Sequence, residues 1–121
     1  YENIASKYWP GALTMIIPCS KNKSQILTSK DLTLGLRIPN SFMAQSLIKE
    51  TGALLTSSAN ISGFTGSTTA EGIRKDFPSV NILGPFPWEK GSGKASTIIS
   101  WEKSRKWRLI REGEVSVKEL Y

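Results

Sequence analysis

The sequence predicts an α/β fold in which helices cover the faces of a β-sheet. Short apolar stretches typical of strands alternate along the chain with segments of helical periodicity, and this interleaving favours a sheet packed against helices. The length of 121 residues fits a single domain, residues 1–121. With 39% hydrophobic and 21% charged residues, the composition is that of a folded globular protein.

The amino-terminal part of the chain predicts a helix followed by a buried strand. Residues 1–9 end a helix, because Ile4, Ala5 and Tyr8 are spaced to share one helical face. Residues 13–17 are apolar and partly β-branched, which favours a buried strand.

Two strands and a capped helix are predicted in the middle of the chain. Residues 34–38 form one strand and residues 53–57 another. Between them, a short polar side chain at Asn40 or Ser41 caps a helix that stops at Gly52.

The carboxyl-terminal half predicts a further helix and a hairpin. Thr68 followed by Glu71 is a capping box that opens a helix. Residues 80–83 predict a short strand, and residues 96–101 and 107–111 predict the two strands of a hairpin. Two smaller helical segments are expected near residues 25–26 and from residue 116.

The sequence contains no histidine and only one cysteine, Cys19. This excludes Ser-His-Asp and Cys-His nucleophile systems, His-ligated metal sites, zinc clusters and an internal disulfide. No carboxylate cluster suggests a dedicated metal site, and no catalytic residue is assigned. The remaining Ser, Thr, Asn, Arg and Lys side chains suit the binding and orientation of an anion.

The chain is basic, with a net charge of +6 and a pI of about 9.6. This charge favours an acidic partner such as a nucleotide or nucleic acid, although it also serves solubility alone. The longest apolar stretches are far too short to cross a bilayer, so no membrane association is expected. Nothing at the start resembles a signal peptide, so a cytoplasmic location is expected.

Polar side chains near the ends of predicted strands are candidate binding residues. Ser58, Asn60 and Ser62 follow the strand at residues 53–57, at the end where open α/β sheets place ligands. The alternative is an ordinary turn, since Ser and Asn favour turns for local backbone reasons. Arg37 lies within an apolar strand, where its guanidinium either pairs with an anion or faces water.

The predicted hairpin carries further candidates. Ser96 opens its first strand and Arg111 ends its second, and both suit a phosphate or carboxylate. Its basic residues form either a solvated tip or a nucleic-acid surface: Lys103, Arg105, Lys106 and Arg108. Trp101 and Trp107 beside them either stack bases or form a cross-strand pair.

Five motifs occur in the order and approximate spacing of one known family. They are Tyr8-Trp9-Pro10-Gly11-Ala12-Leu13-Thr14, Gly35-Leu36-Arg37-Ile38-Pro39, Thr56-Ser57-Ser58-Ala59-Asn60-Ile61-Ser62-Gly63, Ser96-Thr97-Ile98-Ile99 and Leu109-Ile110-Arg111-Glu112-Gly113. On these motifs the sequence resembles the threonylcarbamoyl-AMP synthase family, also called the YrdC or TsaC-like family.

The resemblance implies a twisted, open, mixed α/β sheet flanked by helices, with a positively charged cleft. It implies synthesis of L-threonylcarbamoyl-AMP from L-threonine, bicarbonate and ATP, with magnesium accompanying the ATP and pyrophosphate released. The product feeds threonylcarbamoyladenosine modification of tRNA, so tRNA or double-stranded RNA and downstream tRNA-modification proteins are expected partners. Carried over by position, the cleft residues are Thr14, Arg37, Ser58, Asn60, Ser62, Ser96 and Arg111.

The sequence departs from the family pattern at its start. The family also uses an N-terminal Lys-x-Arg motif, which is absent ahead of Tyr1. The chain is therefore expected to be the C-terminal part of the full family domain, with its activity in this form left open. Two alternatives resemble other branches: a noncatalytic YciO-like binder of double-stranded RNA or tRNA, and the related domain of hydrogenase-maturing carbamoyltransferases.

Overall fold

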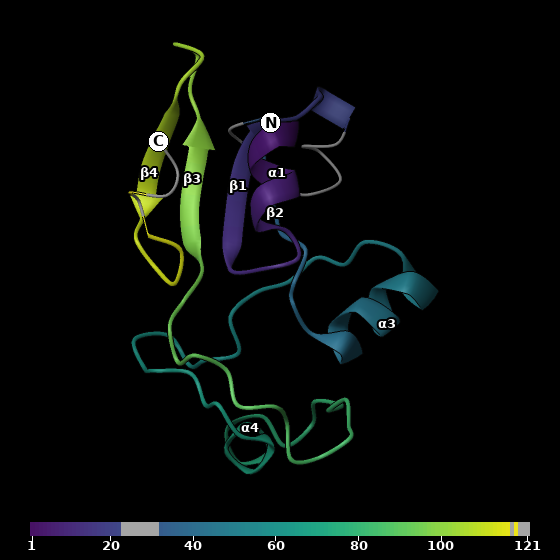
Figure 1. Ribbon diagram of the computed structural model, residues 1–121. Helices are drawn as coiled ribbons and strands as arrows, with labels where there is room; N and C mark the ends of the chain where they lie inside the picture. The colour runs from purple at the N-terminus through teal and green to yellow at the C-terminus, as the bar shows by residue number, and fades with distance from the viewer. Residues whose placement is uncertain (23–31, 117, 119–121) are drawn as a thin grey trace. The chain divides into compact units, whose positions relative to one another are not determined.

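The computed structural model describes residues 1–22, 32–116 and 118 (Figure 1). The elements run in the order α1 (Glu2–Tyr8), β1 (Leu13–Pro18), β2 (Thr33–Leu36), α3 (Phe42–Thr51), α4 (Ala70–Asp76), β3 (Thr97–Trp101) and β4 (Trp107–Arg111). They divide into two compact units, the first formed by Tyr1–Gly52 with Lys94–Tyr121 and the second by Ala53–Gly93. That residues 1–121 act as one domain stays a prediction.

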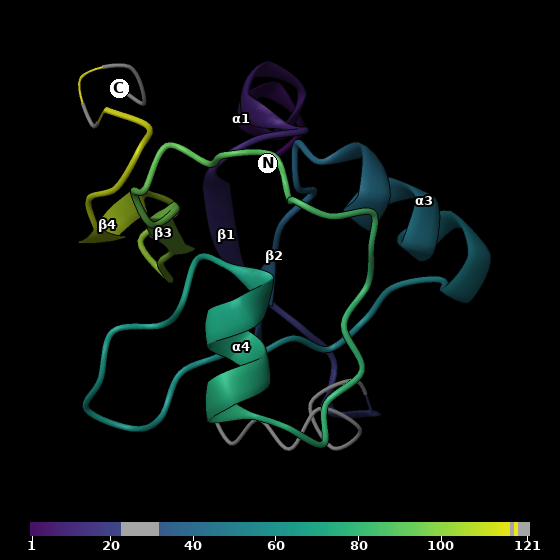
Figure 2. The same ribbon diagram turned by 90° about the horizontal axis from the view of Figure 1, so that it is seen from below.

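The first unit contains a four-stranded sheet in the order β2-β1-β3-β4 (Figure 2). The two central strands, β1 and β3, run parallel, whereas β2 and β4 pair antiparallel with their neighbours. The mixed, open sheet expected from the sequence is therefore confirmed, as is the α/β class.

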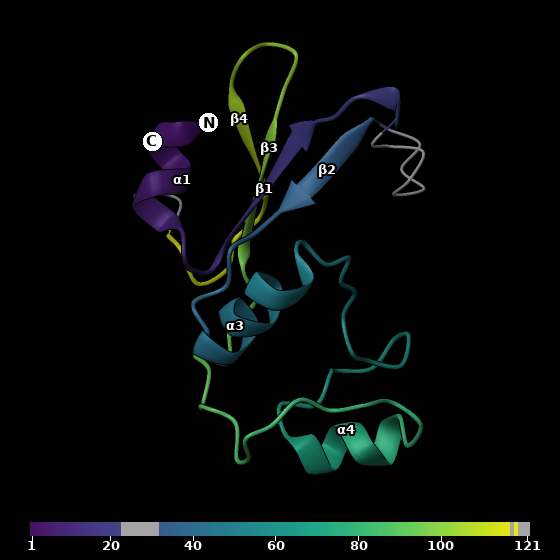
Figure 3. The same cartoon turned by 90° about the vertical axis from the view of Figure 1, so that its right-hand side faces the viewer.

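The core of the first unit lies between the sheet and α1. Leu13, Met15 and Ile99 are at most 2% exposed. Leu13 and Met15 are two residues apart on β1, so both point to the same face of the sheet. That face is covered by α1, whose Ile4, Ala5 and Tyr8 pack against this core as the helical spacing predicts (Figure 3).

The hairpin of β3 and β4 is held at its far end by aromatic rings. Trp101 and Trp107 face each other across the two strands, with ring centroids 5.0 Å apart. Tyr1 makes edge contacts with both rings, at 4.9 and 5.7 Å. The interpretation of these tryptophans as a cross-strand pair is confirmed.

The strand expected at residues 34–38 is shorter in the structure. It ends at Leu36, so Arg37 follows the strand and does not lie inside it. Beyond Leu36 the Ile38 carbonyl accepts from the Gly11 amide, at 2.8 Å, in a bond that does not follow the β1–β2 register. The next helix begins as expected: Ser41, of the two candidate caps, accepts from the Ala44 amide.

The strands expected at residues 53–57 and 80–83 are wrong, since neither segment takes part in the sheet or in another ladder of the described chain. Four of their apolar side chains are about half exposed or more: Leu54, Leu55, Val80 and Leu83. A short apolar run shows no periodicity that separates a buried strand from an irregular segment, and a strand also needs a hydrogen-bonding neighbour.

The second unit is largely irregular around α4. The helix expected there is present, but its cap is Thr69, whose hydroxyl accepts from the Gly72 amide at 3.2 Å, and not Thr68. Ala70 and Ile73 on this helix are buried. The helical segments expected near residues 25–26 and from residue 116 to residue 119 fall on, or run into, residues outside those described.

We expect Ile99→Ala to lower the free energy of unfolding by about 2–5 kcal/mol, because it removes a fully buried side chain and leaves a cavity. Phe42→Ala, at a position 82% exposed, should change it by less than about 0.5 kcal/mol. Urea denaturation followed by circular dichroism measures both. Equal losses for the two variants would place the core elsewhere.

Candidate anion-binding site

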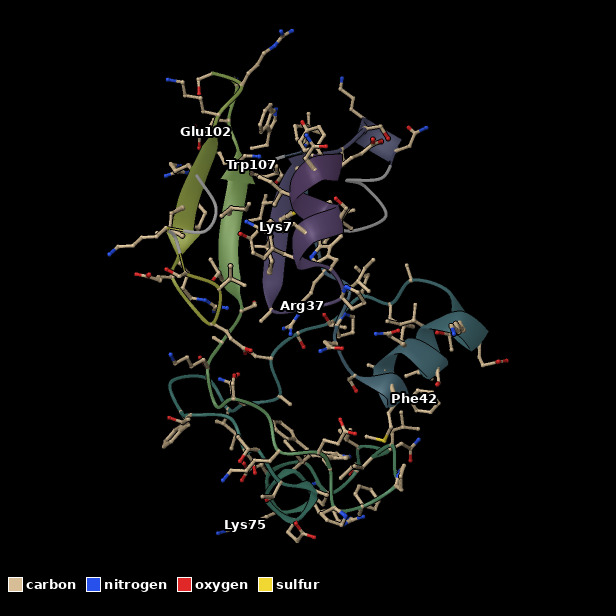
Figure 4. The ribbon with its side chains drawn as sticks, viewed as in Figure 1. Lys7, Arg37, Phe42, Lys75, Glu102 and Trp107 are labelled. Carbon is tan, nitrogen blue, oxygen red and sulfur yellow. The ribbon has the colours of Figure 1, made fainter. Side chains whose placement is uncertain are left out.

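The directions of the four strands bring several predicted residues to one end of the sheet. Because β1 and β3 are parallel to each other and antiparallel to β2 and β4, the starts of β1 and β3 lie beside the ends of β2 and β4. Arg37 follows β2, and Figure 4 shows it at this end of the sheet. Ser96 immediately precedes β3, and Arg111 is the last residue of β4.

Three of the predicted residues form one hydrogen-bonded network there. The Thr14 and Ser96 hydroxyl oxygens lie 2.9 Å apart. The Arg111 guanidinium donates to the Ser96 carbonyl from Nη2 at 2.8 Å and from Nε at 3.2 Å, and Nη2 also lies 3.3 Å from the Ser96 hydroxyl. The structure thus brings Thr14, Ser96 and Arg111 together.

Arg37 is fastened to the turn that precedes β1. Its Nε donates to the Gly11 carbonyl at 2.9 Å. Neither terminal nitrogen of this guanidinium bonds another described residue, so both can donate to two oxygens of one anion. Gly11 is needed at this turn, since a Cβ there would lie 2.3 Å from the Tyr8 carbonyl oxygen.

The electrostatics of this sheet end favour an anion. Arg37 follows β2 and Arg111 ends β4, and these two outer strands lie about 14 Å apart at ordinary strand spacing. The Thr14 and Ser96 hydroxyls come from the two inner strands or the residue just before them. Within the described residues, neither arginine pairs with a carboxylate. Two unneutralised guanidiniums and two hydroxyls therefore offer donors and positive charge.

The position differs from the one expected for a parallel α/β sheet. That position, the carboxyl end of a strand, was expected for Ser58, Asn60 and Ser62 and for Arg111, whereas Ser96 was expected to open a strand. In this mixed sheet only β2 and β4 end at the site, whereas Thr14 and Ser96 lie at the starts of β1 and β3. The antiparallel outer strands thus bring the two arginines to the same end as the hydroxyls.

Ser58, Asn60 and Ser62 belong to the second unit, where they lie on one loop. The Asn60 amide nitrogen donates to the carbonyls of Ile61, at 3.1 Å, and Phe64, at 3.2 Å. Asn60 therefore shapes this turn, as the alternative interpretation of the motif predicts. Ser58 and Ser62 are exposed, and their hydroxyls make no bond with the described residues.

Sequence reasoning left Thr97, the residue after Ser96, out of the candidate site. Thr97 is completely buried, and its hydroxyl bonds the backbone at Gly113 and Val115. A polar β-branched residue between Ser96 and an apolar pair, with a glycine two residues after Arg111, is the signal that was available. In the described part of the chain, no group of three or more His, Cys, Asp or Glu side chains is placed to hold a metal ion.

Comparison with known proteins decides the family. The family model Sua5_yciO_yrdC, described as telomere recombination, matches residues 1–113. The chain belongs to this family.

No helix in the described residues has the length and apolar character needed to span a membrane.

Relatives in the Sua5/YciO/YrdC family carry a common name. The threonylcarbamoyl-AMP synthase of Bacillus subtilis (strain 168) is 34% identical over 82% of this chain and 29% of that protein. The threonylcarbamoyl-AMP synthase of Pyrococcus abyssi is also 34% identical, over 98% of this chain and 35% of that protein. The chain spans about a third of the length of these relatives.

Two solved structures are similar over 98% of this chain. One is a double variant of P. abyssi Sua5, with a TM-score of 0.84, 30% identity and 36% of that chain covered. The other is P. abyssi Sua5 complexed with L-threonine, with a TM-score of 0.82, 29% identity and 35% covered. These likenesses agree with the α/β fold described above.

The hydroxyl contact between Thr14 and Ser96 can be tested by a double-mutant cycle. Because the two side chains bond each other, the combined effect of Thr14→Val and Ser96→Ala on unfolding free energy should deviate from additivity by about 0.5–1.5 kcal/mol. Thr14→Val with Ser100→Ala, which has no such contact, should be additive within about 0.5 kcal/mol. Additivity in both cycles would contradict the contact.

Proposed function

We propose that this chain supplies part of the substrate site of an L-threonylcarbamoyl-AMP synthase. The observation that carries the proposal is the Thr14–Ser96–Arg111 network with Arg37 at the same end of the sheet. The names of its relatives support it, as does the complex of P. abyssi Sua5 with L-threonine. Since the chain spans about a third of those relatives, the whole reaction is proposed for a protein of their length.

The proposed reaction joins L-threonine, bicarbonate and ATP. The threonine amino group and bicarbonate form a carbamate with loss of water, and a carbamate oxygen then attacks the α-phosphorus of ATP. The bond to the departing pyrophosphate breaks as the new phosphorus–oxygen bond forms. Every reactant is an anion or carries one, so the enzyme must offset negative charge and align the carbamate with phosphorus.

The geometry of each residue indicates its role in binding the reactants. Arg37 presents a fork anchored through Nε, which suits a phosphate or carboxylate. Arg111 donates mainly to the Ser96 carbonyl, and its positive charge offsets the negative charge of the reactants. In the same proposal, the Ser58 and Ser62 hydroxyls orient oxygens of the adenylate and carbamate, and the Asn60 amide holds their loop in shape. Alignment and charge stabilisation supply the catalysis, with no protein nucleophile.

Magnesium enters this proposal with ATP. The donors at the sheet end are guanidiniums and hydroxyls, which do not fit a hard divalent cation as a ligand set. We therefore assign the ion to the phosphates of the nucleotide itself. The proposal further places the protein in the cytoplasm, where its product would pass to the proteins that complete the tRNA modification.

Arg37→Ala should weaken ATP binding about tenfold or more in the protein extended to the length of its relatives, because the anion loses a charged fork. Arg37→Lys should give an intermediate value, since a lysine cannot bond Gly11 and present two fixed donors. Isothermal titration calorimetry measures affinity, and threonine- and bicarbonate-dependent pyrophosphate release measures activity. Arg105→Ala removes the same charge from the exposed hairpin and serves as the control; an equal loss there would contradict the assignment.

An RNA-binding function is the second candidate, and the hairpin tip favours it. Arg108 pairs with Glu102, so the one carboxylate of the tip is already used. Three exposed cations remain on the tip, Lys103, Arg105 and Lys106. Figure 4 shows Glu102 at the opposite end of the sheet from Arg37. The tip therefore lies about 16 Å, one strand length, from the proposed substrate site.

This candidate predicts salt-dependent binding of an RNA duplex of random sequence. Replacing Lys103, Arg105 and Lys106 together by Ala should reduce the slope of log affinity against log salt by about 2–3. The matched control removes three exposed lysines elsewhere: Lys49, Lys75 and Lys90. Fluorescence anisotropy measures both series. Equal losses in the two variants would show general charge attraction in place of a hairpin site.

A further inference from the structure

Thr97 joins the start of β3 to the segment that follows β4. Its side chain is polar, yet it is 0% exposed. The hydroxyl accepts from the Gly113 amide at 2.9 Å and donates to the Val115 carbonyl at 2.6 Å. Beside it, the Glu114 amide donates to the Ala95 carbonyl at 3.0 Å. Residues 113–115 are thus bonded to residues 95–97, and we call this arrangement the clasp.

The clasp adjoins both residues of the Ser96–Arg111 contact along the chain. Ser96 immediately precedes Thr97, and Arg111 comes two residues before Gly113. The strand ladder does not fix their separation by itself, because its register shifts between Ile98 and Ile99. Ile98 lies opposite Arg111 and Ile99 opposite Leu109, which leaves one extra residue on β4. The Thr97 hydroxyl restores a defined spacing just beyond this irregularity.

Gly113 shows how closely the two segments approach. A Cβ at this position would lie 2.2 Å from the Ala95 carbonyl oxygen and 2.6 Å from the Thr97 amide nitrogen. Those distances are far inside van der Waals contact and involve backbone atoms that cannot rotate away. The clasp therefore requires a hydroxyl on one side and a glycine on the other.

We propose that Thr97 is a positioning residue, which acts through the clasp to hold the Arg111 guanidinium on Ser96. The consequence for ligand binding rests on the proposed function, whereas the consequence for Arg111 itself does not. Without the hydroxyl, the Gly113 amide and the Val115 carbonyl lose their partner. The segment carrying Arg111 then moves relative to Ser96, and the site loses its defined spacing of donors.

The test follows the Nε–H signal of Arg111 by nitrogen-15 NMR in the 121-residue chain. In the native protein this proton bonds the Ser96 carbonyl, which slows its exchange with solvent. Thr97→Val keeps the shape and removes the hydroxyl, and Gly113→Ala opens the clasp from the other side. Both should speed exchange about tenfold, whereas Thr97→Ser should stay within about twofold of the native protein.

Two controls separate positioning from general destabilisation. Ile99→Val trims a neighbouring core side chain and should lower thermal stability without changing the Arg111 signal. The Nε–H of Arg37, bonded to Gly11, should be unchanged in every variant. Faster exchange at Arg111 in Ile99→Val as well, or none in Thr97→Val, would overturn the proposal. If Thr97→Val does not fold, the contrast of Gly113→Ala with Thr97→Ser decides in the same way.

Nucleotide binding forms a separate arm of the experiment. In the extended protein, Thr97→Val should raise the ATP dissociation constant about tenfold, and Ile99→Val should leave it within about twofold. A native protein that binds no ATP would overturn the proposed function, while the Arg111 signal would still decide the positioning role. A change in the Arg111 signal together with unchanged ATP affinity would overturn the link from the clasp to the ligand.

Discussion

The parallel pairing of β1 with β3 is the constraint on which the site depends. It joins segments far apart in the sequence: Thr14 and Ser96, whose hydroxyls meet, are separated by 82 positions. The same register places Leu13 beside Thr97 and Met15 beside Ile99, which completes the buried face under α1. One face of these two strands therefore forms the core, and the first residues on the other face carry the polar contacts.

Local signals in the sequence were sufficient where a residue acts on its neighbours in the chain. The apolar face of α1, the Ser41 cap and the paired tryptophans of the hairpin all follow from spacing or turn chemistry. The expected strands at residues 53–57 and 80–83 failed for the opposite reason. A strand depends on a partner ladder, and an apolar run of this length does not reveal whether one exists.

The candidate site shows the same division. The family resemblance pointed to Thr14, Ser96 and Arg111, and the structure brings these three residues into contact. The resemblance did not reveal that Arg111 bonds mainly to a carbonyl, or that Asn60 uses its amide to shape its own loop. Such roles depend on the positions of backbone carbonyls, which residue identities do not specify. The bonding partners of Thr97 could not be predicted for the same reason, since both are backbone groups.

The second unit is an insertion: Ala53–Gly93 interrupts the first unit between α3 and β3. During synthesis, β1 and β2 leave the ribosome long before β3, so the inner edge of β1 has no partner until the insertion has been made. Closing the long loop between β1 and β3 has an entropic cost that precedes the gain from pairing these two strands. Folds dominated by contacts between distant residues therefore form slowly. The nascent first unit thus passes through a stage with an unpaired apolar strand edge, at which association with other chains competes with folding.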